Sequence, residues 1–295
     1  MSNITEYPNR VTSACVALTV AGSDSGAGAG IQADLKTFAA LGVYGASAIT
    51  ALTAQNTQGV QAVESVSADF VLRQVQSVLA DMPVKVIKTG MLANAEIISA
   101  LASELPTFIP LVLDPVMVAT SGDRLLADDA LQALRQKLIP RACLLTPNLH
   151  EAAALLDAPV AESVAQMTRQ AEALLTQGAQ AVLLKGGHLQ HPDEAVDVYL
   201  DAERCELLRA RRVRTANTHG TGCTLASAIA AFLARGLSSY EACREAKHYL
   251  TGALTAADRL QVGRGHGPVD HFYAFSYATV ASAAPITQEI SHDSE

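Results

Sequence analysis

The chain has 295 residues, 49% of them hydrophobic, and a formal net charge of −8 at pH 7. An acidic chain without a cluster of lysine and arginine is a poor candidate for binding nucleic acid. The five cysteines are odd in number and form no Cys-x-x-Cys pair, which argues against a disulfide framework or a structural zinc site. No apolar run is long enough to cross a membrane and no signal-peptide pattern is found, so we expect a soluble, cytoplasmic protein.

Short apolar segments alternate with amphipathic stretches along the chain. The short segments are almost entirely apolar, which is typical of strands covered on both faces. Strands are expected at Val16–Ala21, about Gly45–Ala51, Val84–Lys88, Leu111–Leu113, Cys143–Leu145 and Ala181–Leu184. Helices are expected between them at Ile31–Ala40, Phe70–Leu79, Ala95–Ala102, Ala130–Leu138, Glu151–Leu156 and Val164–Leu175. This alternation predicts an α/β fold with a mainly parallel sheet between layers of helices.

The last third of the chain differs in pattern. Two segments, Glu194–Leu200 and Arg204–Arg209, indicate a hairpin near the edge of the sheet, and helices are expected at Gly222–Ala234 and Tyr240–Arg259. No linker rich in Pro, Gly or Ser divides the chain, so we expect a single domain over residues 1–272. Residues 273–295 have little periodicity and are expected to form a mobile tail.

Polar, charged and glycine residues follow almost every expected strand. Binding sites in parallel sheets gather beyond the carboxyl ends of the strands, so these residues are the first candidates for a site. They are Gly22–Gly30, Thr89–Met91, Asp114–Pro115, Thr146–Asn148 with Glu151, and Lys185–Gly187. Any one of them could be ordinary turn chemistry, but five in succession favour a shared site.

The strongest single signal is the sequence Asn-Thr-His-Gly-Thr-Gly-Cys-Thr at residues 217–224, which leads into an apolar helix. Gly220 and Gly222, on either side of Thr221, leave backbone N–H groups open to an anion, and the helix N-terminus adds partial positive charge. The segment therefore predicts an anion hole for a transferring phosphoryl group. Cys223 lies in the first turn, where the pKa of a thiol is expected to fall. The alternative is an ordinary helix cap.

The glycine-rich loop at Gly22–Gly30 is only a broken version of a dinucleotide fingerprint. Asp24 in the loop and Asp34 in the next helix would repel a pyrophosphate, and the chain has no Walker-type Gly-Lys-Ser/Thr. We therefore expect the loop to fold over a neutral or cationic organic substrate, with Asp34 accepting a hydrogen bond from it. The alternative is that Asp34 only interacts with the helix dipole.

Asn148 and Glu151 have the spacing of a capping box, which needs no further function. Asp114, however, follows the neighbouring expected strand, and two carboxylates near one crevice can hold Mg²⁺ on nucleotide phosphates. Lys185 follows a third strand and precedes Gly186–Gly187, where a positive charge suits the phosphates of ATP. Together these residues favour a magnesium and nucleotide site, and a cap with a surface lysine is the alternative.

Several motifs in order resemble the bacterial hydroxymethylpyrimidine/phosphomethylpyrimidine kinases of thiamine biosynthesis. The matching segments are Ala21–Lys36, Thr50–Thr57, Lys88–Leu92, Leu113–Met117, Thr146–Glu151, Lys185–His188 and His219–Thr224. The resemblance runs from about Val16 to His271. It implies a ribokinase-like three-layer α/β/α sandwich, ATP as co-substrate with Mg²⁺, and a homodimer as a family expectation. It also implies phosphorylation of 4-amino-5-hydroxymethyl-2-methylpyrimidine and then of its monophosphate.

The resemblance also implies roles for the residues at the substrate end. Gln55 and Asp34 would hold the aminopyrimidine, while Gly22 and Met91 would line its pocket. The chemistry of the Gln55 amide agrees, because it offers one donor and one acceptor to an amino group beside a ring nitrogen.

Further roles are implied at the phosphate end. Asp114 and Glu151 would organise Mg²⁺, and Lys185, Asn148 and Thr221 would bind the nucleotide. Gly220, Thr221 and Gly222 would form the anion hole. Cys223, expected as a thiolate, would take the place of the aspartate base of related sugar kinases and accept or orient the proton of the hydroxyl group.

Other interpretations remain open. The nearest is a pyridoxal or pyridoxine kinase, which shares the fold, although Gln55 and Met91 favour the pyrimidine. A nicotinamide-dependent oxidoreductase is disfavoured by Asp24 and Asp34, and a non-catalytic binding protein by the complete set of candidate catalytic residues. The sequence departs from the family pattern at Ala119–Ser121, where a lysine is often expected.

Overall fold

A nine-stranded sheet organises the described residues, which in this computed structural model are 14–117, 128–187, 189 and 193–275. The strands are β1 (Val16–Asp24), β2 (Tyr44–Asn56), β3 (Gly59–Ser65), β4 (Val84–Thr89), β5 (Leu111–Leu113), β6 (Leu144–Leu145), β7 (Ala181–Leu184), β8 (Glu194–Asp201) and β9 (Cys205–Arg211). Their order across the sheet is β3-β2-β1-β4-β5-β6-β7-β8-β9. The six strands from β2 through β1 and β4 to β7 run parallel, whereas β3 at one edge and β8 and β9 at the other are antiparallel to their neighbours.

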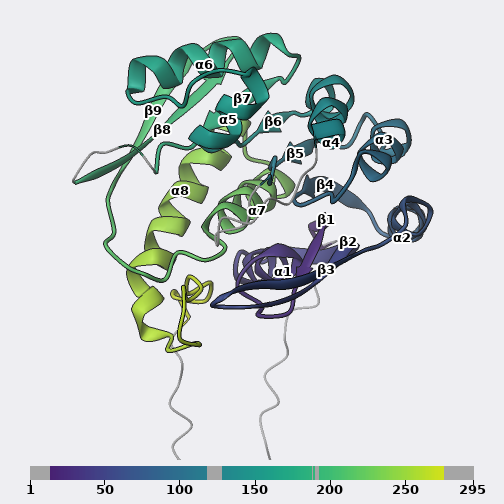
Figure 1. The fold of residues 1–295 in the computed structure, drawn as a ribbon, viewed down its shortest axis with the longest axis horizontal. Helices are drawn as coiled ribbons and strands as arrows, with labels where there is room; N and C mark the ends of the chain where they lie inside the picture. The colour runs from purple at the N-terminus through teal and green to yellow at the C-terminus, as the bar shows by residue number, and fades with distance from the viewer. Residues whose placement is uncertain (1–13, 118–127, 188, 190–192, 276–295) are drawn as a thin grey trace, which may run out of the picture.

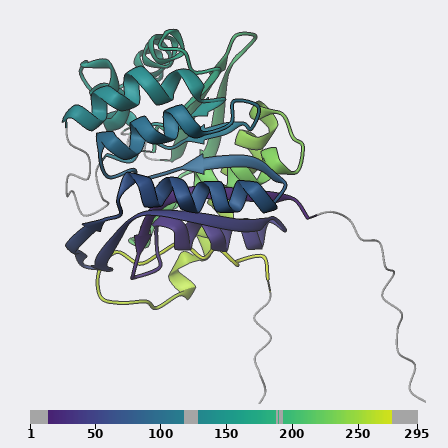
Figure 2. The ribbon, with the colours of Figure 1, turned by 90° about the vertical axis from the view of Figure 1, so that its right-hand side faces the viewer.

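Helices cover both faces of this sheet (Figures 1 and 2). They are α1 (Gly30–Ala40), α2 (Ala68–Asp81), α3 (Ala95–Glu104), α4 (Asp128–Ala133), α5 (Leu149–Leu156), α6 (Val164–Thr176), α7 (Thr221–Ala234) and α8 (Ser239–Ala256). Two separate buried cores show which helices share a face. Val16, Leu18 and Val20 of β1 belong to the core with α2–α6, whereas Ala17 belongs to the core with α1, α7 and α8. The predicted three-layer α/β/α sandwich is therefore confirmed.

Most expected elements lie where the apolar periodicity placed them. The expected strands at Leu111–Leu113 and Ala181–Leu184 are found with the same bounds, and the late hairpin is found as β8 and β9. The expected helix over residues 130–138 differs, because α4 ends at Ala133 and a π-helical turn continues it over Leu134–Leu138. Serine and asparagine side chains accept backbone N–H groups at the starts of α2, α3, α5, α6 and α8, which explains why those helices begin where they do.

The strand β3 was not predicted. It pairs antiparallel with the second half of β2, which itself runs on to Asn56, five residues beyond its expected end. Most of β3 is exposed, and its residues mix apolar and polar side chains without the continuous apolar run of the central strands. The two strands form a hairpin that extends beyond the helix layers, and this hairpin carries Gln55.

The last described residues pack beneath α7 and α8. The Nε2 atom of His271 lies 3.0 Å from Thr224 Oγ1, and the hydroxyl of Tyr249 donates a hydrogen bond of 2.6 Å to the carbonyl of His271. Within the described residues, no helix is both long and apolar enough to cross a membrane. The expected tail over 273–295 lies mostly outside the described residues, as does the departure at Ala119–Ser121.

The buried His271 predicts a loss of stability in mild acid. Burial, together with the nearby Lys36, lowers the pKa of His271 from 6.5 to about 4. Between pH 6.5 and 4 the unfolded chain therefore binds a proton that the folded protein does not, and stability falls as the pH falls through this window. The contribution is roughly 3 kcal/mol at its limit. Urea unfolding at pH 7.5, 5.5 and 4.5 is expected to show a smaller acid-dependent loss for His271→Gln than for the wild type. Equal losses would contradict the assignment.

Candidate active site

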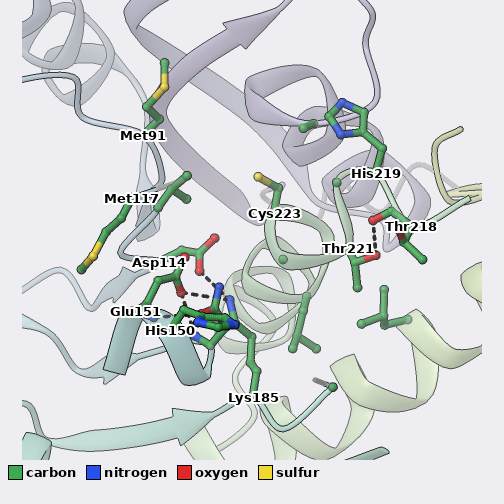
Figure 3. Close-up of a pocket in the computed structure, with 18 of the residues that line it drawn as sticks. Met91, Asp114, Met117, His150, Glu151, Lys185, Thr218, His219, Thr221 and Cys223 are labelled. Carbon is green, nitrogen blue, oxygen red and sulfur yellow. Dashed lines mark hydrogen bonds and ion pairs between the residues drawn. The ribbon is translucent and has the colours of Figure 1, made fainter. Parts of the chain in front are cut away.

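A cavity of about 1070 Å³ opens beyond the carboxyl ends of the parallel strands. Residues from β1, β2, the ends of β4–β7 and the start of α7 line it, so the five candidate segments from the sequence converge on one site. Figure 3 shows Met91 and Met117 on one side of the pocket, with Asp114, Glu151 and Lys185 gathered nearby. Cys223 lies between these residues and His219.

Lys185 forms the centre of a charged cluster at one end of the cavity. Its Nζ donates a hydrogen bond of 3.0 Å to Asp114 Oδ1 and lies 3.9 Å from Glu151 Oε2. The three side chains are nearly buried. Thr146 Oγ1 also donates to Asp114 Oδ1, which leaves no hydrogen bond on Oδ2 within the described chain. Asp114, Glu151 and Lys185 are therefore brought together as predicted.

Asn148 and Glu151 form a complete capping box at the start of α5. The Asn148 side chain accepts the Glu151 N–H at 2.9 Å, and Glu151 Oε2 accepts the Asn148 N–H at 2.7 Å. The structural and the functional interpretations are therefore compatible, because the cap uses Oε2 and fixes the carboxylate at the wall of the cavity. The Asn148 oxygen is already occupied by the cap.

The three charged groups of this cluster influence one another's pKa values. Burial raises the pKa of the Glu151 carboxyl to about 7, with Lys185 opposing the rise and Asp114 adding to it. Burial alone would lower the pKa of Lys185, but Asp114 and Glu151 outweigh it and the pKa is raised. Lys185 is therefore a permanent positive charge in the cavity.

The helix α7 begins directly opposite this cluster. A Cβ placed on Gly222 would lie 3.4 Å from Lys185 Nζ and 4.0 Å from Asp114 Oδ2, so the first turn faces the ion pair without a side chain between them. Gly220 has φ +77°, a conformation that L side chains rarely adopt, and its N-cap position has no side-chain hydrogen bond. Thr221 Oγ1 donates to the Thr218 carbonyl. The Thr221 N–H also donates to the Thr218 carbonyl at 3.2 Å, so within the described chain the N–H groups of Gly222 and Cys223 are the ones available to an anion at the start of α7.

Cys223 lies on this first turn, but its surroundings do not favour the thiolate that the sequence predicted. Burial raises the pKa of the thiol to about 11, against the opposing effect of the nearby Lys88 ammonium. The local sequence showed the helix N-terminus, which favours the thiolate, and not the surrounding packing, which disfavours it more.

The opposite end of the cavity contains the expected pyrimidine residues. Gln55, at the end of β2, and Met91, after β4, both line the wall. A Cβ placed on Gly22 would lie 2.3 Å from the Met91 Cε, so the absence of a side chain at Gly22 makes room for Met91. Gln55, Gly22 and Met91 are therefore brought together.

Asp34 does not belong to this group. It is fully buried in α1 and does not line the cavity. Both of its oxygens lie 2.9 Å from Lys88 Nζ, while Thr19 and Ser227 hydroxyls donate at 2.6 Å. The prediction that Asp34 holds the substrate is not supported by this arrangement, because its hydrogen-bonding capacity is used inside the core. The sequence could not show its partner, which lies 54 residues away on β4.

Among the cavity residues that were not proposed as candidates are Asp24, Met117, His150 and His219. Asp24 and His219 stand in the motifs already singled out, so their position was visible even though no role was assigned. Met117 and His150 follow Asp114 and Asn148 closely, but an isolated methionine or histidine carries no signal of its own.

The fold and the site define a kinase of the ribokinase-like type, with a cation, two carboxylates and an open helix start in a cavity that Gln55 and Met91 also line. The family model for phosphomethylpyrimidine kinase matches residues 24–270. The chain belongs to this family.

Curated relatives match the chain over nearly their whole length. The hydroxymethylpyrimidine/phosphomethylpyrimidine kinase of Rhizobium meliloti is 56% identical over 259 residues, which are 88% of this chain and 97% of the relative. The protein of the same name from Salmonella typhimurium is 52% identical over 261 residues, 88% of this chain and 98% of the relative.

Solved structures agree on the fold. The pyridoxal kinase from Staphylococcus aureus in complex with AMP-PCP and pyridoxal is 34% identical with a TM-score of 0.82, covering 90% of this chain and 96% of its own. The phosphomethylpyrimidine kinase from Clostridium difficile is 42% identical with a TM-score of 0.72, and the match covers 81% of this chain and 99% of the Clostridium difficile chain. The predicted family and fold are confirmed.

Breaking the buried pair of Asp34 and Lys88 is expected to destabilise the protein strongly. Lys88→Met leaves an uncompensated buried carboxylate, which costs about 3–5 kcal/mol. The double variant Lys88→Met/Asp34→Asn removes that charge while keeping an acceptor for Thr19 or Ser227, and is expected to recover part of the loss. Urea unfolding measures the stability of the single and the double variant. A double variant less stable than Lys88→Met would show that the pair's charge is not the cause.

The raised pKa of Cys223 predicts slow alkylation at neutral pH. The thiolate fraction at pH 7.5 is on the order of 10⁻⁴–10⁻³ for a pKa of about 11. Iodoacetamide labelling, followed by mass spectrometry, is expected to modify the exposed Cys205 first. The rate at Cys223 is expected to rise about tenfold per pH unit from pH 7 to 9.5. A rate that levels off below pH 8 would show a thiolate already formed at neutral pH.

Proposed function

We propose that this protein transfers the γ-phosphate of ATP to 4-amino-5-hydroxymethyl-2-methylpyrimidine and then to the resulting monophosphate, in thiamine biosynthesis. The observation that carries the proposal is the joining of two sites in one cavity. The Lys185 cluster faces the open start of α7, Gln55 and Met91 line the same cavity, and Cys223 lies between the Lys185 cluster and His219. Family membership and the names of the relatives support the same reaction.

The phosphate end is suited to charge neutralisation. Phosphoryl transfer depends mainly on positioning and on stabilising charge on the transferred group. Lys185 would bind the phosphate oxygens of the nucleotide, and the backbone N–H groups at the start of α7 would stabilise the charge that develops during transfer. Thr221, at the mouth of this turn, would contact the nucleotide.

The same end has the chemistry of a magnesium site. Mg²⁺ prefers oxygen ligands and usually binds proteins through one or two carboxylates, with substrate phosphates and water completing the shell. Asp114 Oδ2 and Glu151 Oε1 carry no hydrogen bond in the described chain, and both carboxylates lie within 3.9 Å of Lys185 Nζ through their other oxygens. Asp114 and Glu151 would thus hold the ion, which would supply positive charge to the phosphates of ATP.

Cys223 would act on the acceptor as a neutral thiol. With its pKa raised, the thiol can orient the substrate hydroxyl by a hydrogen bond, and a preformed base is not needed when the transition state is loose. This proposal replaces the thiolate expected from the sequence. A homodimer and a cytoplasmic location remain predictions.

The first test offers Mg²⁺, ATP and three acceptors separately: the pyrimidine alcohol, its monophosphate and pyridoxal. Release of ADP and mass spectrometry of the product are the measurements. Turnover of both pyrimidines with little on pyridoxal is expected. Turnover of pyridoxal alone would replace the proposed substrate and favour the activity named for the Staphylococcus aureus structure.

The charge of Lys185 is expected to be needed for turnover. Lys185→Gln is expected to lower kcat by at least about 100-fold, because it removes a cation from the developing charge. The KM for the pyrimidine is expected to change little, since Gln55 and Met91 lie at the other end. Lys137→Gln, on an exposed lysine outside the cavity, serves as the matched control. A kcat for Lys185→Gln within threefold of the wild type would remove this role.

A further inference from the structure

Three segments meet at the wall of the cavity around the side chain of Gln55. The Nε2 atom of His219 lies 2.9 Å from Asp24 Oδ2 and 3.3 Å from the amide atom placed as Gln55 Nε2. The amide atom placed as Gln55 Oε1 lies 3.2 Å from Thr53 Oγ1. Asp24 ends β1, Thr53 and Gln55 belong to β2, and His219 directly precedes the start of α7. The hydrogen-bonding requirements of these neighbours determine which way the Gln55 amide faces.

Asp24 requires a proton on the His219 Nε2 atom. Its carboxylate accepts the backbone N–H groups of Gly26, Gly28 and Ala29 at 2.8–3.0 Å, so it acts only as an acceptor. Burial alone would raise the pKa of Asp24, but the hydrogen bonds from His219 and these amides outweigh it and the pKa is lowered. The contact at 2.9 Å therefore needs Nε2–H as the donor. This single N–H points mainly at Asp24, and an amide NH₂ group beside it would set N–H against N–H, so the group of Gln55 that lies 3.3 Å from Nε2 is favoured to be the amide oxygen.

Thr53 leads to the same orientation from the other side. Its hydroxyl lies 2.9 Å from the Ser23 carbonyl, which can only accept. A hydroxyl has a single proton, and with that proton on Ser23 it presents only lone pairs to Gln55. The end of the amide beside Thr53 must then be the NH₂ group. The nitrogen and oxygen of a glutamine amide are assigned from such networks, and here both neighbours favour the reverse of the placed orientation.

The imidazole of His219 is itself held firmly. A Cβ placed on Gly28 would lie 2.2 Å from His219 Cδ2, so the ring packs directly against the glycine-rich loop. The backbone N–H of His219 donates to the Gly267 carbonyl at 3.0 Å, which fixes the main chain that carries the ring. The ring therefore cannot easily move away to accommodate an amide with its NH₂ toward His219, which would set N–H against N–H and oxygen against the lone pairs of Thr53.

We infer that His219 is a specificity-determining positioning residue, which locks the Gln55 amide with its oxygen toward His219 and its NH₂ toward Thr53. The inference rests on the proposed function for its substrate class. A locked amide accepts a hydrogen bond at one fixed point and donates at the other. A ring with an amino group beside an unprotonated nitrogen matches this pattern, with its amino group on the His219 side. A 4-oxo ring, which has a protonated nitrogen beside a carbonyl, presents the reverse pattern and is rejected.

The test compares two ligands that differ only in this pattern, the 4-amino pyrimidine alcohol and its 4-oxo analogue. Dissociation constants are measured by calorimetry without ATP, and ADP release is measured separately. The wild type is expected to bind the amino ring at least about 100-fold more tightly, since the reversed pattern leaves two buried polar groups unpaired. His219→Met removes the donor at similar size, so the amide can turn and the ratio is expected to fall below about tenfold. His219→Gln restores an N–H toward Asp24 and Gln55 and is expected to recover most of the ratio.

The outcomes separate the inference from the proposed function. A His219→Met variant that keeps the wild-type ratio would overturn the inference, as would a His219→Gln variant that resembles His219→Met. A wild type that binds the two rings equally would overturn it as well. If the wild type binds the amino ring much more tightly than the oxo ring but releases no ADP with it, the proposed reaction is removed and the fixed orientation of the Gln55 amide is still supported. If His219→Met does not fold, Asp24→Asn can donate to His219 Nε2 and so removes the requirement for a proton there, and an unchanged ratio in that variant would contradict the inference.

Discussion

The ion pair between Asp34 and Lys88 is the constraint on which the rest of the site depends. Both side chains are fully buried, and the carboxylate also accepts hydrogen bonds from Thr19 on β1 and Ser227 on α7. One carboxylate therefore ties two helices to two central strands. Because a buried charge is tolerated only when fully paired, these four elements have little freedom to shift relative to one another. The start of α7, with Cys223 and the open glycines, takes its place in the cavity from this arrangement. Lys88 also opposes the rise in the pKa of Cys223, so the core influences the chemistry of the cavity directly.

The general architecture could be predicted because its causes are local. Central strands such as Leu111–Leu113 are continuous apolar runs, and helices such as α5 begin at a side-chain cap that the sequence shows. The residues at the strand exits could be predicted for the same reason, since parallel strands bring their carboxyl ends to one edge. The strand β3 was not predicted because it forms by pairing with β2 at an exposed edge, where no apolar run is needed.

The errors have a common physical origin in packing between distant segments. Asp34 was assigned to the substrate because its partner Lys88 was not recognisable from the sequence, and Cys223 was assigned a low pKa because only the helix start was visible. His219 was overlooked within a motif that was otherwise well understood, since its importance comes from Asp24 and Gln55, which lie 195 and 164 residues away. Local chemistry in the sequence thus predicted which residues share the cavity, and it could not predict which of them pair with one another.

The contact between Gly28 and Gly220 limits how the substrate end of this enzyme's cavity could be redesigned. A Cβ placed on Gly220 would lie 1.8 Å from the carbonyl oxygen of Gly28, so the two loops lie against each other through their backbones alone. Any attempt to enlarge the substrate end by rebuilding the first loop would displace the anion hole at the same time. Met91, in the wall that it forms with Met117, contacts this loop at Gly22 only through the end of its flexible side chain, and methionine side chains adapt readily to new shapes. Laboratory evolution toward larger rings would therefore be expected to accumulate changes at the methionine wall and to leave the glycine loops intact.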